Sequence, residues 1–135
     1  MPEPRILVVA AALYDAAGRV LIAQRPAGKH LAGRWEFPGG KVIAGESELE
    51  ALGRELHEEL GVEVSAARAF MRLKHAYEDR EVELSLWLIE RYRGVPSALD
   101  GQRLKWVAPE ELAREDLLEA DQPFIAALGE LPSRG

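Results

Sequence analysis

Hydrophobic residues gather in short runs in the first part of this chain. The run over 6–13 is short and β-branched at its start, which predicts a buried strand. Turn residues follow at 15–18, and a second apolar run covers 19–24. We therefore expect these two strands to form a hairpin.

Period-two alternation marks the second half of the chain. Segments 62–73 and 82–90 predict two longer strands, joined through a turn at 77–80. Residues 104–107 predict one more short strand.

In the first half of the chain, a short strand at Trp35 is expected to run into a proline-glycine-glycine turn over 38–40.

The clearest helix covers 47–60. Ser47 followed by Glu50 is a capping-box pattern, and Gly61 stands where a helix C-terminus favours glycine. Four leucines fall on one stripe at helical spacing, so this face is expected to pack on a sheet. They are Leu49, Leu52, Leu56 and Leu60.

Two further helices are expected near the C-terminus. One is short and starts at Pro109; the other is amphipathic and opens at Asp121, with Phe124 on its apolar face. Strands mixed with flanking helices indicate the α/β class, with helices packed on a mixed sheet. The length of 135 residues suits one domain over 1–135.

Composition narrows the classes of function. The chain has no cysteine, which excludes a disulfide framework, a zinc-thiolate site and a catalytic thiol. Its 17 Lys and Arg against 23 Asp and Glu give a net charge of −6, which argues against binding a polynucleotide. A small phosphorylated ligand stays open, because metal ions can reverse the local sign of charge. No apolar run approaches the roughly 20 residues of a membrane helix, and no signal peptide is apparent, so we expect a cytoplasmic protein.

Three carboxylates share one face of the central helix. Glu55, Glu58 and Glu59 stand at i, i+3 and i+4, and Arg54 can reach Glu58 but leaves the others uncompensated. A solvated acidic face is one interpretation. The other is a cation site, because the preceding Gly39 and its neighbours can bring backbone groups close to the carboxylates. Such hard oxygen ligands suit Mg²⁺ or Mn²⁺.

The spacing around these residues resembles a known family. Gly40 is followed by five residues and Glu46, then by seven residues and the run Arg54-Glu55-Leu56-x-Glu58-Glu59-x-Gly61-Val62. This pattern is similar to the Nudix signature. The resemblance implies the Nudix fold, a mixed β-sheet sandwiched between helices. It also implies hydrolysis of a nucleoside diphosphate linked to another group.

The resemblance also implies roles for individual residues. Glu55, Glu58 and Glu59 are expected to hold divalent ions, with the Gly39 carbonyl as a further ligand. Arg54 is expected to orient Glu55 rather than touch the substrate. The bound ions would position the polyphosphate and activate a water molecule.

Residues 35–41 resemble the MutT-type subgroup, which hydrolyses nucleoside triphosphates to monophosphate and pyrophosphate. In that subgroup an acidic residue on a mobile loop joins the metal site, and Asp100 stands at that position. Glu55 and Asp100 are rival candidates for the general base. The alternative for Asp100 is a turn residue beside Gly101.

The same resemblance implies a nucleotide-binding set. Arg25 and Arg80 are expected near the nucleotide, although Arg80 can equally be a turn residue. Phe37 is expected against the base, with ordinary core packing as its alternative. Asp121 replaces the asparagine of the bacterial prototype and is expected to read the base. Its alternative role is the N-cap of the last helix.

The leading hypothesis is a Mg²⁺-dependent nucleoside triphosphate pyrophosphohydrolase, with oxidised dGTP as the main candidate substrate. A pyrophosphohydrolase acting on CTP or modified dCTP is the alternative within enzymes, because relatives acting on cytidine triphosphates also carry Asp at the position of Asp121. A non-catalytic nucleotide-sensing module is the alternative from another class. A small nucleotide is the expected partner, with no polynucleotide and no membrane, and the protein is expected to be a monomer or homodimer.

Overall fold

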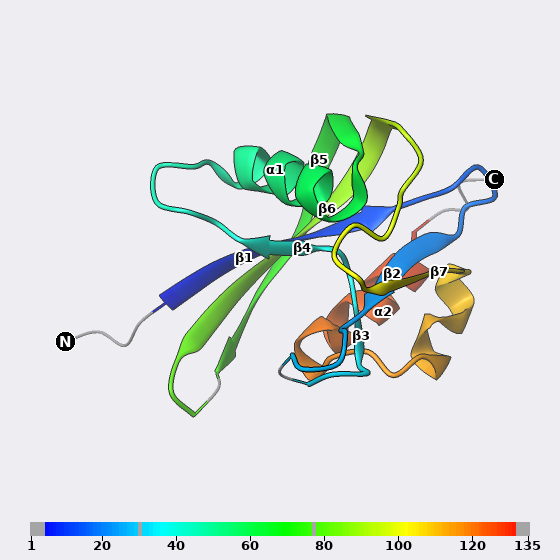
Figure 1. The fold of residues 1–135 in the computed structure, drawn as a ribbon. Helices are drawn as coiled ribbons and strands as arrows, with labels where there is room; N and C mark the ends of the chain where they lie inside the picture. The colour runs from blue at the N-terminus through cyan, green and yellow to red at the C-terminus, as the bar shows by residue number, and fades with distance from the viewer. Residues whose placement is uncertain (1–4, 30, 77, 132–135) are drawn as a thin grey trace.

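Two β-sheets and two α-helices make up the computed structural model, which describes residues 5–29, 31–76 and 78–131 (Figure 1). One sheet has the strand order β4-β1-β6-β5 and the other has the order β3-β2-β7. The strands are β1 (Arg5–Leu13), β2 (Val20–Gln24), β3 (Trp35–Glu36), β4 (Gly39–Lys41), β5 (Glu63–Ala76), β6 (Glu81–Arg93) and β7 (Arg103–Val107). The helices are α1 (Glu48–Leu60) and α2 (Gln122–Gly129), with 3₁₀ turns η1 (Pro109–Arg114) and η2 (Glu119–Asp121).

The four-stranded sheet is mixed and has apolar cores on both faces. β1 runs parallel to β6 and antiparallel to β4. Val9 and Ala11 pack in the core that holds α1, whereas Ala10 and Ala12 pack in the core that holds Phe124 of α2. A strand covered on both faces has no position for polar side chains, which explains the continuous apolar run. The predicted α/β class, with a mixed sheet between helices, is confirmed.

Helix α1 begins and ends at the predicted residues. Ser47 Oγ accepts from the Glu50 N–H at 3.0 Å, and the Glu50 carboxylate accepts from the Ser47 N–H at 2.9 Å. Gly61 closes the helix at φ 73°. Ala51, Leu52, Leu56 and Leu60 form the buried face. The placement of Leu49 on that face is wrong: it is 48% exposed, because it lies in the first turn, before the residues that enter the core.

Two local predictions around the first strands are also wrong. β1 and β2 are joined only by one bridge, Tyr14 to Val20, and then enter different sheets, so they do not form an extended hairpin. The expected turn over 38–40 is partly strand, because β4 pairs Gly39 with Ala10 of β1. A Cβ at Gly39 would overlap the Val9 carbonyl oxygen. Glycine here therefore allows two strands to approach closely, rather than making a turn.

The later elements follow the prediction more closely. β5 and β6 form the long antiparallel hairpin, with register shifts near Ala66 and Met71. Its predicted turn includes Tyr77, which lies outside the described residues. η1 starts at Pro109, and α2 has Phe124 on its buried side. No helix in the described part of the chain is long and apolar enough to span a membrane.

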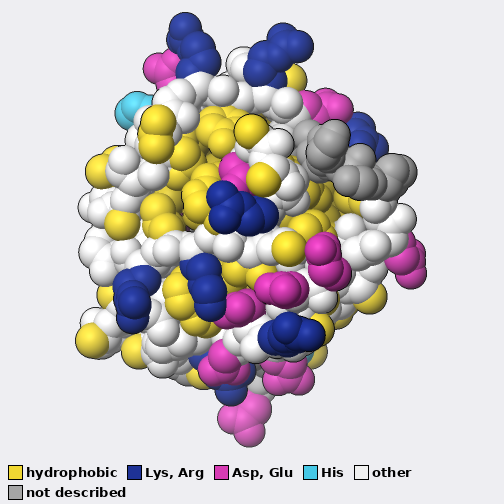
Figure 2. Space-filling view, turned by 90° about the vertical axis from the view of Figure 1, so that its right-hand side faces the viewer, with side chains coloured by type: hydrophobic (Ala, Val, Ile, Leu, Met, Phe, Trp, Pro, Cys, Tyr) yellow, Lys and Arg dark blue, Asp and Glu magenta, His cyan; other side chains and the backbone are white. Residues whose placement is uncertain are grey.

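The surface seen in Figure 2 carries charges of both signs. Lys and Arg side chains are interspersed with Asp and Glu across this face, with apolar surface between them. A polynucleotide backbone requires a continuous basic surface. This face does not offer one.

Candidate active site

Strand β4 and helix α1 bring backbone and carboxylate groups together. The Gly39 N–H donates to Glu59 Oε2 at 3.1 Å. A Cβ built at Gly40 would lie 2.5 and 2.6 Å from the two carboxylate oxygens of Glu55, so the absence of a side chain there leaves room for this carboxylate. Gly40 thus lets β4 pack directly against the predicted metal-binding face of α1.

Arg54 forms hydrogen bonds with several carboxylates of the cluster. Its guanidinium donates to both oxygens of Glu46, at 2.6 and 3.0 Å, and to Glu55 Oε1 at 2.9 Å. It also donates to the Lys41 carbonyl at 3.0 Å, while Glu58 is more distant at 3.4 Å. Hydrogen bonds from Arg54 lower the pKa of Glu46 to about 2. Arg54 therefore lies where a residue that orients Glu55 must lie, and that role stays a prediction.

Glu59 is the most electrostatically strained carboxylate of the helix. Burial raises its pKa to about 8, and the charges of Glu55, Glu36 and Asp100 add to this, against the Gly39 N–H. Burial also raises the pKa of Glu55, opposed by Arg54. Negative charge is therefore in excess here, and a bound cation would relieve it.

The donor set fits a hard divalent cation, but it is not preorganised. Within the residues that the structure describes, no three acidic or imidazole side chains converge into a ready metal site. The reason lies in their present partners: Glu55 is held by Arg54 and Glu59 by Gly39, while the Glu58 side chain is 57% exposed. Carboxylates that can rotate from these positions, beside a backbone carbonyl at Gly39, are the ligands that Mg²⁺ and Mn²⁺ favour.

The loop between β6 and β7 brings Asp100 to the same region. The Leu99 N–H donates to the Glu59 carbonyl at 3.1 Å, and the charge of Asp100 contributes to the raised pKa of Glu59. Asp100 itself is exposed and lies in a turn. Asp100 is therefore a turn residue and also lies near the helix carboxylates, so its two alternative roles are compatible.

Asp121 and Phe37 form a buried contact directly after the end of β3. Asp121 is 5% exposed, and its Oδ2 accepts from the Phe37 N–H at 3.3 Å. Asp121 is the N-cap residue of α2, as its alternative role expected, but its side chain makes no capping hydrogen bond there. Phe37 is 3% exposed, and its ring lies edge-on to Phe124 with centroids 6.2 Å apart. The Phe37 side chain is thus core, as its alternative interpretation expected, and its contact with a base stays a prediction.

Glu36 is a residue that the sequence analysis left without a role. It pairs with Ala23 across β2 and β3, and its carboxylate lies 3.3 Å from the Arg25 guanidinium. Burial raises its pKa, opposed by Arg25. Its charge raises the pKa of both Glu59 and Asp121, so it lies between the two halves of the site. The only signal in the sequence was its position directly before Phe37.

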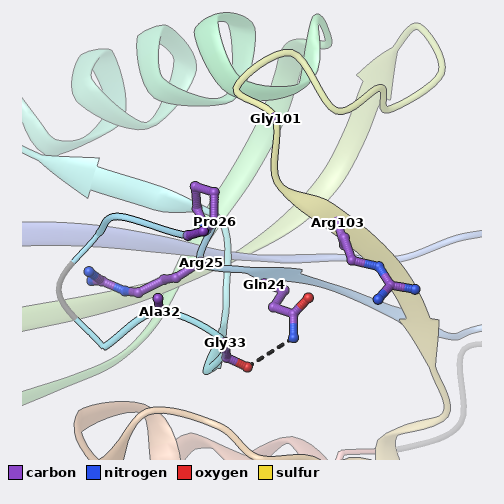
Figure 3. Close-up of a pocket in the computed structure, with 8 residues that line it drawn as sticks. Gln24, Arg25, Pro26, Ala32, Gly33, Gly101 and Arg103 are labelled. Carbon is purple, nitrogen blue, oxygen red and sulfur yellow. Dashed lines mark hydrogen bonds between the residues drawn. The ribbon is translucent and has the colours of Figure 1, made fainter.

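A shallow pocket of about 450 Å³ lies beside this region (Figure 3). Arg25 and Arg103 both line it, but their side chains point in opposite directions (Figure 3). Gln24 lies between them and donates to the Gly33 carbonyl at 3.0 Å. The pocket lining comprises Gln24, Arg25, Pro26, Ala27, Ala32, Gly33, Gly101 and Arg103.

Arg80 is not joined to these groups by any contact among the described residues. Its guanidinium lies 4.0 Å from Asp79 in the connection between β5 and β6. Of the predicted nucleotide-binding residues, Arg25 and Asp121 therefore meet around Glu36, with Phe37 alongside. The part expected of Arg80 stays a prediction.

The site thus consists of a glutamate-rich helix packed against a glycine-containing strand, within a mixed sheet flanked by helices. The NUDIX domain family matches residues 9–127 of this chain, and the chain belongs to that family. It is a Nudix hydrolase, and Nudix hydrolases generally use a divalent metal.

The chain is similar to several nucleotide hydrolases of bacteria. The chain is 38% identical to the CTP pyrophosphohydrolase of Escherichia coli, over 91% of each chain. It is also 38% identical to the 8-oxo-dGTP diphosphatase of E. coli, over 83% of this chain and 87% of that protein. A structure from an analysis of MutT of Aliivibrio salmonicida and Vibrio cholerae superposes with a TM-score of 0.81 at 34% identity, covering 93% and 97% of the two chains.

Proposed function

We propose that this protein hydrolyses nucleoside triphosphates to nucleoside monophosphate and pyrophosphate, with Mg²⁺ as the metal. The observation that carries the proposal is the gathering of acidic side chains around the buried Glu59 carboxyl, beside the contact between Asp121 and Phe37. The first site favours a cation that binds polyphosphate, and the second offers a buried polar group suited to reading a base. Oxidised dGTP is the leading substrate, and CTP or modified dCTP is the second.

The residues of the chain would divide the work as follows. Glu55, Glu58 and Glu59 would hold the ions together with the Gly39 carbonyl, and Asp100 would approach from its loop. When bound, the ions would neutralise the polyphosphate and lower the pKa of a water molecule. Arg54 keeps the Glu55 carboxylate in place, and either Glu55 or Asp100 would take the proton from the water.

The CTP pyrophosphohydrolase and the 8-oxo-dGTP diphosphatase of E. coli are equally identical to this chain, so both substrates should be tested together. The protein would be incubated with Mg²⁺ and a panel of normal, oxidised and methylated triphosphates, and both pyrophosphate and orthophosphate would be assayed. Pyrophosphate release from oxidised dGTP at the highest kcat/KM supports the leading substrate, and preference for CTP supports the second. Orthophosphate as the product, or no turnover of any triphosphate, would contradict the proposal.

Mg²⁺ affinity is expected to rise with pH between about 6 and 8. The raised pKa of Glu59, about 8, keeps this carboxyl protonated at neutral pH, and a bound ion must displace that proton. One released proton corresponds to an affinity gain of up to about tenfold per pH unit. Calorimetric titration at about pH 6, 7 and 8, each in two buffers of different ionisation enthalpy, measures the affinity and the proton release. The Glu59→Gln variant is the control and should lose the dependence; a pH-independent affinity in the wild type would count against Glu59 as a ligand.

Base preference is expected to change with pH through Asp121. Burial and the charge of Glu36 raise its pKa to about 7, against the Phe37 N–H and Arg25. Above pH 7 the ionised group only accepts and suits the N4 amine of cytosine, whereas the protonated group can donate to the O6 of a guanine. The ratio of kcat/KM for CTP to that for 8-oxo-dGTP should therefore rise by about tenfold from pH 6 to 8.5. Taking the ratio cancels effects of pH on the shared metal site.

The Asp121→Asn variant tests whether ionisation of Asp121 causes the change in base preference with pH. Its amide donates and accepts at every pH, so the ratio should become constant and should favour the oxidised guanine nucleotide. If the ratio varies with pH in the variant as it does in the wild type, Asp121 does not set the preference.

A further inference from the structure

The loop that carries Asp100 is attached to the end of helix α1. The last carbonyl groups of a helix have no partner within the helix. Here the Ser97 N–H donates to the Leu60 carbonyl at 2.9 Å and the Leu99 N–H donates to the Glu59 carbonyl at 3.1 Å. The loop thus satisfies two carbonyls at the C-terminal end of the helix that bears the predicted metal ligands.

One side chain adds a second connection between the same two segments. Gln102 is 8% exposed, one of the few buried polar side chains in the described part of the chain. Its Oε1 accepts from the Asp100 N–H at 2.8 Å, and its Nε2 donates to the Glu59 carbonyl at 3.1 Å. A primary amide both donates and accepts, so glutamine can make both bonds at once.

The two bonds join the backbone of Asp100 to the backbone of Glu59. Gly101 between Asp100 and Gln102 has φ 73°, a conformation that glycine adopts readily, and the chain reverses there so that Gln102 reaches back to both groups. Because Gln102 is buried, either bond left unmade would leave an amide or backbone group without a partner, which favours keeping both. The exposed Asp100 carboxylate is therefore carried on a backbone fixed relative to the helix.

We propose that Gln102 is a positioning residue that sets the place of Asp100 relative to Glu59 and so completes the metal site. This inference rests on the proposed function, in which both carboxylates face the bound ions. Gln102 itself touches neither ion nor nucleotide in this proposal. Its amide keeps the loop carboxylate at the end of α1, and its loss would free the loop while leaving Glu55, Glu58 and Glu59 in place.

The test replaces Gln102 by Met, which keeps the length of the side chain but can make neither hydrogen bond. Mn²⁺ binding would be measured by electron paramagnetic resonance of the free ion, alongside kcat and KM. We expect Mn²⁺ affinity and kcat each to fall roughly tenfold, as for outer partners of metal ligands, with KM little changed. Hydrogen exchange should increase at residues 97–101, while the amides of α1 before Glu59 stay protected.

The decisive measurement is a double-mutant cycle with Asp100→Asn. If Gln102 acts through Asp100, then Gln102→Met should reduce Mn²⁺ affinity and kcat no further in the Asp100→Asn background. An equal additional loss in that background would show a general structural role and overturn the proposal, as would unchanged Mn²⁺ affinity in the single variant. Gln102→Asn, whose shorter amide cannot span both partners, repeats the test should the Met variant not fold.

A matched control lies in the same loop. Ser97 Oγ donates to the Val95 carbonyl at 3.2 Å, a bond that stays within the loop and does not reach α1. Ser97→Ala should therefore leave Mn²⁺ affinity and kcat unchanged. If the wild type releases no pyrophosphate from any triphosphate, the proposed function fails, yet the Mn²⁺ and exchange measurements still decide the role of Gln102.

Discussion

Replacing Glu59 with Gln is expected to reduce kcat by roughly 10²–10³-fold, on the scale of removing one preorganised electrostatic group from an active site. The same change should make the metal-free protein more stable. The amide oxygen of the introduced glutamine can still accept from the Gly39 N–H, so the geometry at 3.1 Å is kept while the charge is lost. The loss of turnover would therefore report on charge at the metal site rather than on folding.

The gain in stability should depend on pH in a defined direction. The pKa of Glu59 is raised from 4.5 to about 8 in the folded state. Below pH 4.5 the carboxyl is protonated in both states, so the variant and the wild type should be equally stable. As pH rises toward 8 only the unfolded state ionises readily, and the wild type loses stability relative to the variant, by up to about 4 kcal/mol.

Urea unfolding with a metal chelator, at about pH 3.5 and at pH 8, measures this difference. Glu110→Gln, at an exposed position on η1, is the control and should change neither stability nor kcat. Full activity of Glu59→Gln would show that the Glu59 carboxylate is not needed as a metal ligand. Equal stability of the variant and the wild type at pH 8 would show that folding does not raise the pKa of Glu59.

The central helix could be predicted in detail because its signals are local. A capping box involves Ser47 and Glu50, three residues apart, and the C-terminal glycine follows directly on the helix. The spacing of Glu55, Glu58 and Glu59 is likewise a property of one helical turn. Neither feature depends on distant parts of the chain, so each was visible in the sequence.

The strand arrangement could not be predicted in the same way. Gly39 and Gly40 have the composition of a turn, and only their pairing with β1, some 30 residues earlier, makes them a strand. β1 and β2 separate into two sheets because β1 finds its parallel partner in β6, far along the chain. Such pairings depend on contacts between segments that are remote in sequence, and local propensity does not encode them.

The two residues that gained roles only from the structure illustrate the same limit. Gln102 meets the Glu59 carbonyl across 43 positions of sequence. Glu36 is held by Arg25 and acts on both Glu59 and Asp121. Each is an ordinary polar residue by composition, and its importance comes from its burial and its partners. Electrostatic roles of this kind follow from three-dimensional proximity and not from residue type.

Gly40→Ala should reduce kcat by about 10²-fold while costing little stability. The new Cβ would lie 2.5 and 2.6 Å from the oxygens of the Glu55 carboxylate, which must therefore move. This carboxylate is the end of a flexible side chain, so it can rotate away without disturbing β4 or α1. Displacement of a catalytic group by about an ångström is enough for an activity loss of that size.

Gly53→Ala is the matched control, because Gly53 lies on the same helix and has nothing within 4 Å of a new Cβ. Alanine within a helix is more favourable than glycine by about 0.5–1 kcal/mol, so this variant should unfold at a higher temperature and keep its kcat. Both variants would be compared by kcat, Mn²⁺ affinity and thermal unfolding. A Cβ at Gly39 would meet backbone atoms first, whereas a Cβ at Gly40 would meet the Glu55 carboxylate first, so Gly39→Ala should unfold readily where Gly40→Ala does not. If Gly40→Ala kept both Mn²⁺ affinity and kcat, the position of Glu55 beside β4 would have no part in the reaction, and Asp100 would be the remaining candidate for the general base.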